Sequence, residues 1–105
     1  MADIALILSK LKNGLAEIYG SRLHTLNVYG SYARNEGVSG SDIDVALVLD
    51  DFEDSWTEIE CTGALVSRIS LEHNVVISIL PIRERHWKER QSPLLINIRK
   101  ESVAV

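Results

Sequence analysis

The first pattern of apolar positions predicts an amphipathic helix over residues 3–19. Its apolar side chains recur at spacings of three and four, which places them on one stripe. The stripe consists of Ile4, Ile7, Leu8, Leu11, Leu15 and Ile18. Asp3 is a residue type that favours the N-cap, and Gly20 one that ends helices. A helix with such a stripe has to bury it against another layer of structure.

Three apolar runs predict strands over residues 24–29, 43–49 and 74–82. The second run is apolar at both odd and even positions beyond Asp44, so we expect that strand to be covered on both faces. The third run is the most apolar part of the chain, and it predicts a buried strand closed by Pro81.

The remaining patterns predict helices over residues 55–72, 83–90 and 93–101. Asp54 or Ser55 suits the N-cap of the first, whose apolar side consists of Trp56, Ile59, Gly63, Val66 and Ile69. The second presents Trp87, and the third opens with Ser92-Pro93, a cap followed by proline at the first helical position. Helices that alternate with strands predict an α/β fold in one domain, with helices packed on a small sheet of three or four strands.

Composition narrows the class of protein. No apolar run approaches the roughly 20 residues of a membrane span, and no signal peptide opens the chain. Cys61 is the single cysteine, and we expect a small buried helix residue rather than a catalytic thiol. Without a possible internal disulfide, the chain suits a reducing cytoplasm. We therefore expect a cytoplasmic protein without a membrane anchor.

The charges are unevenly distributed. The formal net charge is −4, which argues against direct nucleic-acid binding, because phosphate contacts need clustered Lys and Arg. Residues 42–60 hold eight acids and no Lys or Arg, whereas residues 83–100 hold six basic residues against Glu84 and Glu89. Solvated helix faces explain both blocks by default. The alternative is a pair of complementary patches for a protein partner in a homo- or hetero-oligomer.

The candidate chemistry lies in residues 28–49. Gly30-Ser31 ends the first strand, and a glycine before a helical turn lets phosphate approach exposed backbone N–H groups. Asp42 and Asp44 stand two apart at the start of the second strand, so their carboxylates share one face. Two adjacent carboxylates repel each other and are costly to desolvate unless a hard divalent cation lies between them. Each pattern alone is common in turns or on surfaces, but together they predict a nucleotide and metal site.

These residues also carry a resemblance. Gly-Ser-Tyr-Ala-Arg at 30–34, followed by Ser-Asp-Ile-Asp at 41–44, resembles the G-S-x-A-R…S-D-x-D signature of the minimal nucleotidyltransferases. These are the small members of the polymerase-β-like nucleotidyltransferase superfamily. The resemblance covers most of the chain, since residues 74–82 and 93–101 are similar to later elements of the family. It implies a compact core like the polymerase-β palm.

The resemblance also implies roles for individual residues. Asp42 and Asp44 would hold the Mg²⁺ that bridges the triphosphate of ATP. Gly30 and Ser31 would bind the terminal phosphates. Arg34 would contact phosphate or brace the loop, with the two roles equally open. Ser41 would orient the carboxylates or, as the simpler interpretation, cap the turn.

One departure from the family pattern concerns the third carboxylate. Aligning Pro81 with the family's V-D-L-V-P strand places Ser78 at the aspartate position. A serine cannot act as the third metal-coordinating carboxylate or as a general base. Asn35 likewise stands where a glycine often follows the arginine.

The resemblance implies a partner as well as an activity. Small domains of this family are often antitoxins of HEPN/MNT toxin–antitoxin pairs, and they transfer AMP from ATP to a tyrosine of a HEPN-domain toxin. The first hypothesis is therefore an Mg²⁺-dependent protein adenylyltransferase. The second, favoured by Ser78, is a weak or inactive nucleotide-binding module that regulates its partner by contact. Transfer to a small molecule is a third hypothesis, with no substrate-binding domain to support it.

Overall fold

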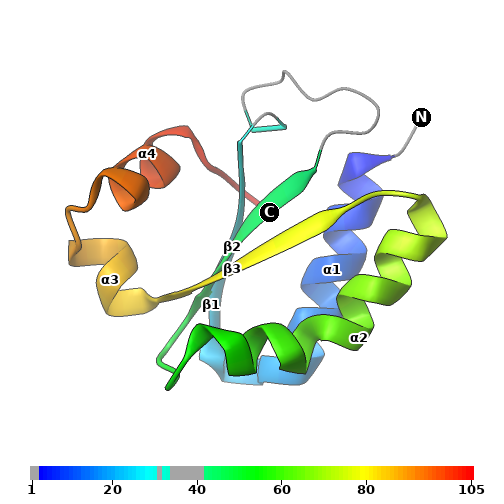
Figure 1. The fold of residues 1–105 in the computed structure, drawn as a ribbon, viewed down its shortest axis with the longest axis horizontal. Helices are drawn as coiled ribbons and strands as arrows, with labels where there is room; N and C mark the ends of the chain where they lie inside the picture. The colour runs from blue at the N-terminus through cyan, green and yellow to red at the C-terminus, as the bar shows by residue number, and fades with distance from the viewer. Residues whose placement is uncertain (1–2, 31, 34–41) are drawn as a thin grey trace.

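The computed structural model describes residues 3–30, 32–33 and 42–105. Within them, helices and strands alternate as the sequence predicts (Figure 1). The elements are α1 (Ile4–Tyr19), a 3₁₀ turn (Gly20–Arg22), β1 (Leu23–Tyr29), β2 (Ile43–Leu49), α2 (Ser55–His73), β3 (Ile77–Arg83), α3 (Glu84–Glu89), α4 (Pro93–Glu101) and β4 (Val103–Ala104).

The strands form one mixed sheet of four strands in the order β3-β2-β1-β4. β1 is antiparallel to both β2 and β4, whereas β2 and β3 are parallel. As a result, the C-terminal end of β1 lies beside the N-terminal ends of β2 and β3. The predicted α/β class and the small sheet are confirmed.

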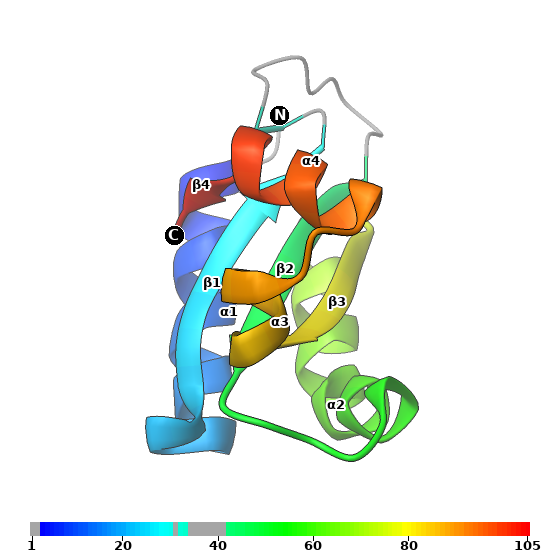
Figure 2. The same ribbon diagram turned by 90° about the vertical axis from the view of Figure 1, so that its left-hand side faces the viewer.

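Helices cover the sheet on both faces, and α3 and α4 lie in front of it when α1 and α2 lie behind (Figure 2). The larger core lies between α1, α2 and the sheet and includes Ile7, Leu11 and Ile69. The smaller core lies on the opposite face and joins α4 to β2 and β3. Its buried residues are Ala46, Val48, Ile82, Leu95 and Ile98. No helix of the described residues is long and apolar enough to span a membrane.

The helix starts follow the predicted caps. The Asp3 carboxylate accepts a hydrogen bond from the Leu6 N–H at 3.1 Å, and the Ser92 hydroxyl accepts one from the Leu95 N–H at 3.3 Å. Of the two cap candidates for α2, Asp54 holds the position. Each of these bonds satisfies a backbone donor that has no partner within the helix.

The predicted apolar side of α2 is confirmed at Ile69 and wrong at Trp56 and Ile59. Trp56 is 68% exposed and Ile59 39% exposed. The buried face carries Ile69, as predicted, together with Glu58, Thr62 and Leu65, spaced as one helical stripe. The Thr62 hydroxyl donates to the Glu58 carbonyl at 3.1 Å, so a polar residue fits this face. Large side chains misled the prediction because burial follows position on the helix rather than size.

The third strand also differs from its prediction. Asn74 adopts a left-handed conformation as the C-cap of α2, so β3 begins only at Ile77. β3 lies at the edge of the sheet and is partly exposed, and Pro81 sits within it. An edge strand tolerates proline because one side needs no hydrogen bonds. Apolar content therefore overstated the burial of this strand.

Smaller differences concern single side chains. Ile18 is 45% exposed, and Tyr19 takes the buried position at that end of α1. Cys61 is exposed rather than buried. Trp87, which the predicted short helix presents, packs against the smaller core. β4 was not predicted, because a strand of two residues has no detectable period.

Candidate functional site

The candidate residues lie where β1 ends and β2 and β3 begin. Asp44 is the second residue of β2, and it pairs across the sheet with Tyr29 of β1 and with Ser78 of β3. Side chains in register on neighbouring strands point to the same face. That face is the one covered by α3 and α4, because Ala46 and Val48 of the same strand belong to the smaller core.

Asp42 and Asp44 form an adjacent pair of carboxylates, as predicted. Asp42 directly precedes β2 and is exposed, whereas Asp44 is half-buried. Burial, and then the charge of Asp42, raise the pKa of the Asp44 carboxyl above its usual range. No ion pair with a basic side chain of the described residues offsets this. Such a pair fits a divalent cation, which would relieve both the burial cost and the repulsion.

Gly30 lies directly against this pair. Its φ of +75° is a conformation that favours glycine. A Cβ at this position would lie 2.6 Å from Asp44 Oδ2, so any other residue here would require the carboxylate to shift. The glycine therefore allows both the backbone conformation of the turn and the close approach of the Asp44 carboxylate.

Glu101, the last residue of α4, joins the site although no sequence motif indicates it. Its Oε1 accepts a hydrogen bond from the Gly30 backbone N–H at 3.2 Å. Burial, with smaller contributions from Asp44 and Glu101, raises the pKa of Tyr29, so both carboxylates share the surroundings of that ring. The only signal in the sequence was an acid at a helix end that disfavours acids.

Three of the predicted nucleotide-binding residues lie outside the described residues. They are Ser31, Arg34 and Ser41. The structure therefore brings together Gly30, Asp42 and Asp44 and adds Ser78 and Glu101. In the part of the chain that is described, no group of three His, Cys, Asp or Glu side chains could hold a metal ion.

The acids that follow β2 have structural roles. Arg83 Nε donates to Asp51 Oδ1 at 3.0 Å, and its Nη2 donates to the Glu53 carbonyl at 2.9 Å. Arg22 Nε donates to Asp50 Oδ1 at 3.1 Å. These contacts fix the connection between β2 and α2.

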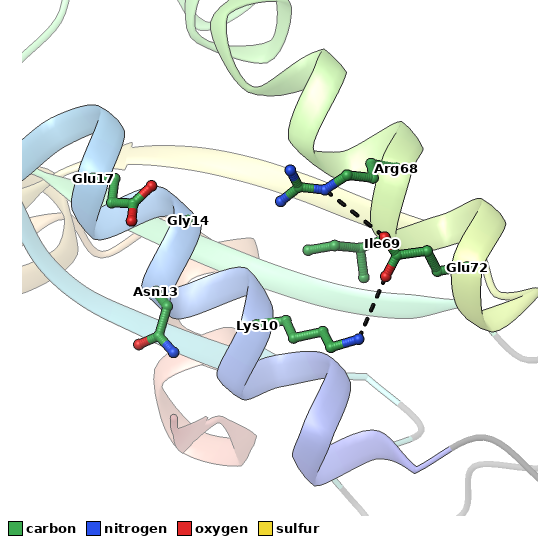
Figure 3. A pocket seen from close by; sticks show the side chains of 7 residues that line it. All are labelled: Lys10, Asn13, Gly14, Glu17, Arg68, Ile69 and Glu72. Carbon is green, nitrogen blue, oxygen red and sulfur yellow. Dashed lines mark hydrogen bonds and ion pairs between the residues drawn. The ribbon is translucent and has the colours of Figure 1, made fainter.

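A depression of about 400 Å³ lies between α1 and α2, on the opposite face of the sheet (Figure 3). Lys10 and Arg68 both point toward Glu72 there, at 3.4 and 4.0 Å. Three of its charged groups, Lys10, Arg68 and Glu72, are thus paired with one another, and no candidate residue lines it.

Comparisons with known proteins agree with the fold. The family model described as the nucleotidyltransferase domain matches residues 8–102. No curated protein sequence matches the chain. Several solved structures share the fold, and each has a low sequence identity to this chain.

One similar structure is a toxin–antitoxin with AMP-PNP, at a TM-score of 0.64 and 17% identity over 90% of this chain and 68% of that chain. Another is a tri-AMPylated Shewanella oneidensis HEPN toxin in complex with MNT antitoxin, at a TM-score of 0.51 and 14% identity, covering 93% and 70%. A third comes from Sulfolobus solfataricus and is described as a nucleotidyltransferase, with a TM-score of 0.56 and 22% identity, covering 93% and 75%.

Proposed function

Because the chain belongs to the nucleotidyltransferase domain family, we propose that it transfers AMP from ATP to a hydroxyl group of a protein partner. The observation that supports this most directly is the contact between Asp44 and Gly30, where a Cβ would lie 2.6 Å from the carboxylate. The contact joins the two halves of the expected site, which are the metal-binding carboxylates and the phosphate-binding turn.

In this proposal Asp42 and Asp44 hold Mg²⁺. The bound ion would neutralise the triphosphate and polarise the α-phosphate. Gly30 and Ser31 bind the terminal phosphates through backbone N–H groups and the serine hydroxyl. Arg34 contacts phosphate or braces the loop, and Ser41 orients the carboxylates or caps the turn.

The transfer replaces one phosphorus–oxygen bond with another. The acceptor oxygen bonds to the α-phosphorus, the bond from that phosphorus to the bridging oxygen breaks, and pyrophosphate leaves. The hydroxyl proton has to pass to a base. Ser78, in register with Asp44, has no carboxylate to accept it. We therefore assign the proton to solvent or to a group of the partner.

The proposed partner is a HEPN-domain protein, and the proposed acceptor is one of its tyrosines. Support comes from the similar structures, one of which contains an AMPylated HEPN toxin with its MNT antitoxin. The chain would then be the antitoxin, acting as a protein adenylyltransferase.

Ser78 favours a second function. Without a third carboxylate, the site could bind nucleotide without turnover, and the chain would neutralise its partner by contact alone. The two functions differ in one measurable result: transfer adds the mass of AMP to the partner, and contact alone leaves its mass unchanged.

The test uses the chain co-purified with its HEPN partner, labelled ATP and Mg²⁺. We expect label on the partner, and we expect the double variant Asp42→Asn/Asp44→Asn to abolish labelling and Mg²⁺-dependent ATP binding while circular dichroism stays unchanged. Full labelling by the double variant would show that the carboxylates are surface residues. Binding without labelling by the unaltered chain would favour the contact function.

A further inference from the structure

The Glu101 carboxylate contacts the backbone of the candidate phosphate-binding turn. Glu101 Oε1 lies 3.2 Å from the Gly30 nitrogen and accepts its N–H. That N–H belongs to the glycine that packs against Asp44. A carboxylate oxygen and a phosphate oxygen are both anionic acceptors, and backbone N–H groups of such a turn bind either.

The position of Glu101 is not explained by helix stability. An acid in the last turn of a helix faces the negative end of the helix dipole. The preceding residues, Arg99 and Lys100, are the types that suit this end. The bond to Gly30 therefore compensates for an unfavourable position.

Anchors on both sides hold Glu101 at the site. Ile98, three residues earlier, is 2% exposed in the smaller core. On the other side, Val103 and Ala104 pair with Val28 and Asn27 of β1. α4 therefore ends close to the end of β1. The Glu101 side chain reaches the turn from this fixed backbone position.

We propose that the Glu101 carboxylate occupies the place of a nucleotide phosphate oxygen at the Gly30 N–H and is displaced when nucleotide binds. The inference rests on the proposed function, because it assumes that this turn receives phosphate. One N–H cannot form a good hydrogen bond to two anions at once. The carboxylate would also repel the incoming phosphate. Glu101 thus lowers the affinity of the site for phosphorylated ligands.

The test compares affinities for Mg-ATP by calorimetry across four proteins. These are the unaltered chain, Glu101→Gln, Glu101→Ala and the control Glu89→Gln. The control removes the same charge from an exposed position on α3. We expect roughly tenfold tighter binding by Glu101→Ala, the worth of one charge-assisted hydrogen bond, and a smaller gain by Glu101→Gln, whose amide oxygen can still accept the Gly30 N–H. The control should bind like the unaltered chain.

The amide signal of Gly30 in ¹⁵N spectra gives a second readout. It should shift in Glu101→Ala without ligand, and it should shift in the unaltered chain when Mg-ATP is added. Weaker or equal binding by the Glu101 variants would overturn the displacement. If the unaltered chain still bound Mg-ATP in that case, the proposed function would stand. If no variant bound Mg-ATP, both proposals would fail.

Discussion

At the scale of single residues, Ser78 decides how fast the proposed transfer can run. It lies in register with Asp44 on the neighbouring parallel strand, so a carboxylate there would join the existing pair. A lost general base costs about 10²–10⁴ in rate. We expect Ser78→Asp to raise AMP transfer from labelled ATP at least about tenfold at saturating Mg²⁺. Without metal, a third clustered acid should lower the stability.

Ser67→Asp is the control, because Ser67 is exposed on α2. It adds the same charge without reaching the site. A slower transfer by Ser78→Asp in a chain that already labels its partner rapidly would place the base elsewhere. Absence of labelling in every version would support the contact function.

Gly30 provides a second prediction at this scale. Gly30→Ala adds a Cβ 2.6 Å from Asp44 Oδ2 at a φ of +75°. Gly20 is a control, since its φ of +56° is also positive while a Cβ there would have nothing within 4 Å. Both variants should lose about 1–2 kcal/mol of stability from the backbone alone. Only Gly30→Ala should also lose Mg-ATP binding, measured by calorimetry. Equal binding by the two variants would contradict a role for the Gly30–Asp44 contact.

Much of the candidate site could be predicted from local spacing. The two-residue spacing of Asp42 and Asp44 and the glycine at the end of β1 each belong to one short stretch. The pairing of Asp44 with Ser78 required only that β2 and β3 be neighbours. Glu101 could not be predicted, because its contact joins residues 71 positions apart. Such a contact depends on how α4 docks, and no local pattern encodes that.

At the scale of elements, the N-cap of α2 allows a direct test of stability. Asp54 accepts hydrogen bonds from the Thr57 N–H and the Thr57 hydroxyl, both at 2.9 Å. The bond from the Thr57 N–H is the main cause that lowers the pKa of the Asp54 carboxyl. An acid whose pKa is lowered in the folded state stabilises it above its unfolded pKa. That stability disappears as the pH falls through the folded-state pKa.

Asp54→Ala should therefore lower the melting temperature by a few degrees at neutral pH. The difference from the unaltered chain should shrink as the pH falls below the ordinary value near 3.8. Glu53→Ala is the control, because the contact that Glu53 makes with Arg83 uses its backbone carbonyl, which the substitution keeps. A loss that stays constant down to low pH would show that the carboxylate charge is not involved.

The elements differ in how well local sequence specified them. β2 and α4 match their predicted bounds because caps, proline and continuous apolar runs mark both ends. The buried face of α2 was predicted only in part, because Glu58 and Thr62 interrupt its hydrophobic stripe. The start of β3 was misplaced because Val75 and Val76 are apolar but belong to the connection after the Asn74 cap.

At the scale of the whole molecule, basic side chains gather around α3 on the face opposite α1 and α2. A groove of about 200 Å³ lies beside it, lined by β3, α3, α4 and the first residue of α2. Leu80, Pro81 and Leu94 contribute apolar surface to it, and His86 and Arg90 contribute basic groups. Burial, and then the nearby arginines, lower the pKa of His86. The groove therefore combines apolar surface with a positive field.

These observations refine the surface expected to bind the partner. Lys88 pairs with Glu84 at 2.5 Å, and Trp87 packs against the smaller core. Both side chains are therefore already engaged within the chain. Arg85 and Arg90 are exposed and form no ion pair within the described residues. Exposed basic groups beside apolar surface suit an acidic segment of a protein partner.

Arg85→Glu/Arg90→Glu should therefore weaken the complex with the proposed HEPN partner by about tenfold or more, because charge reversal turns attraction into repulsion. Co-purification and calorimetry at two salt concentrations would measure this, and the difference should shrink at high salt. Arg68→Glu is the matched control, since Arg68 lies on α2 beside the depression on the opposite face. Its side chain pairs with Glu72. If the control weakened the complex and the double variant did not, the partner would bind the face of α1 and α2. In that arrangement the face that carries α3 and α4 would remain open to solvent, and nucleotide could enter without passing the partner.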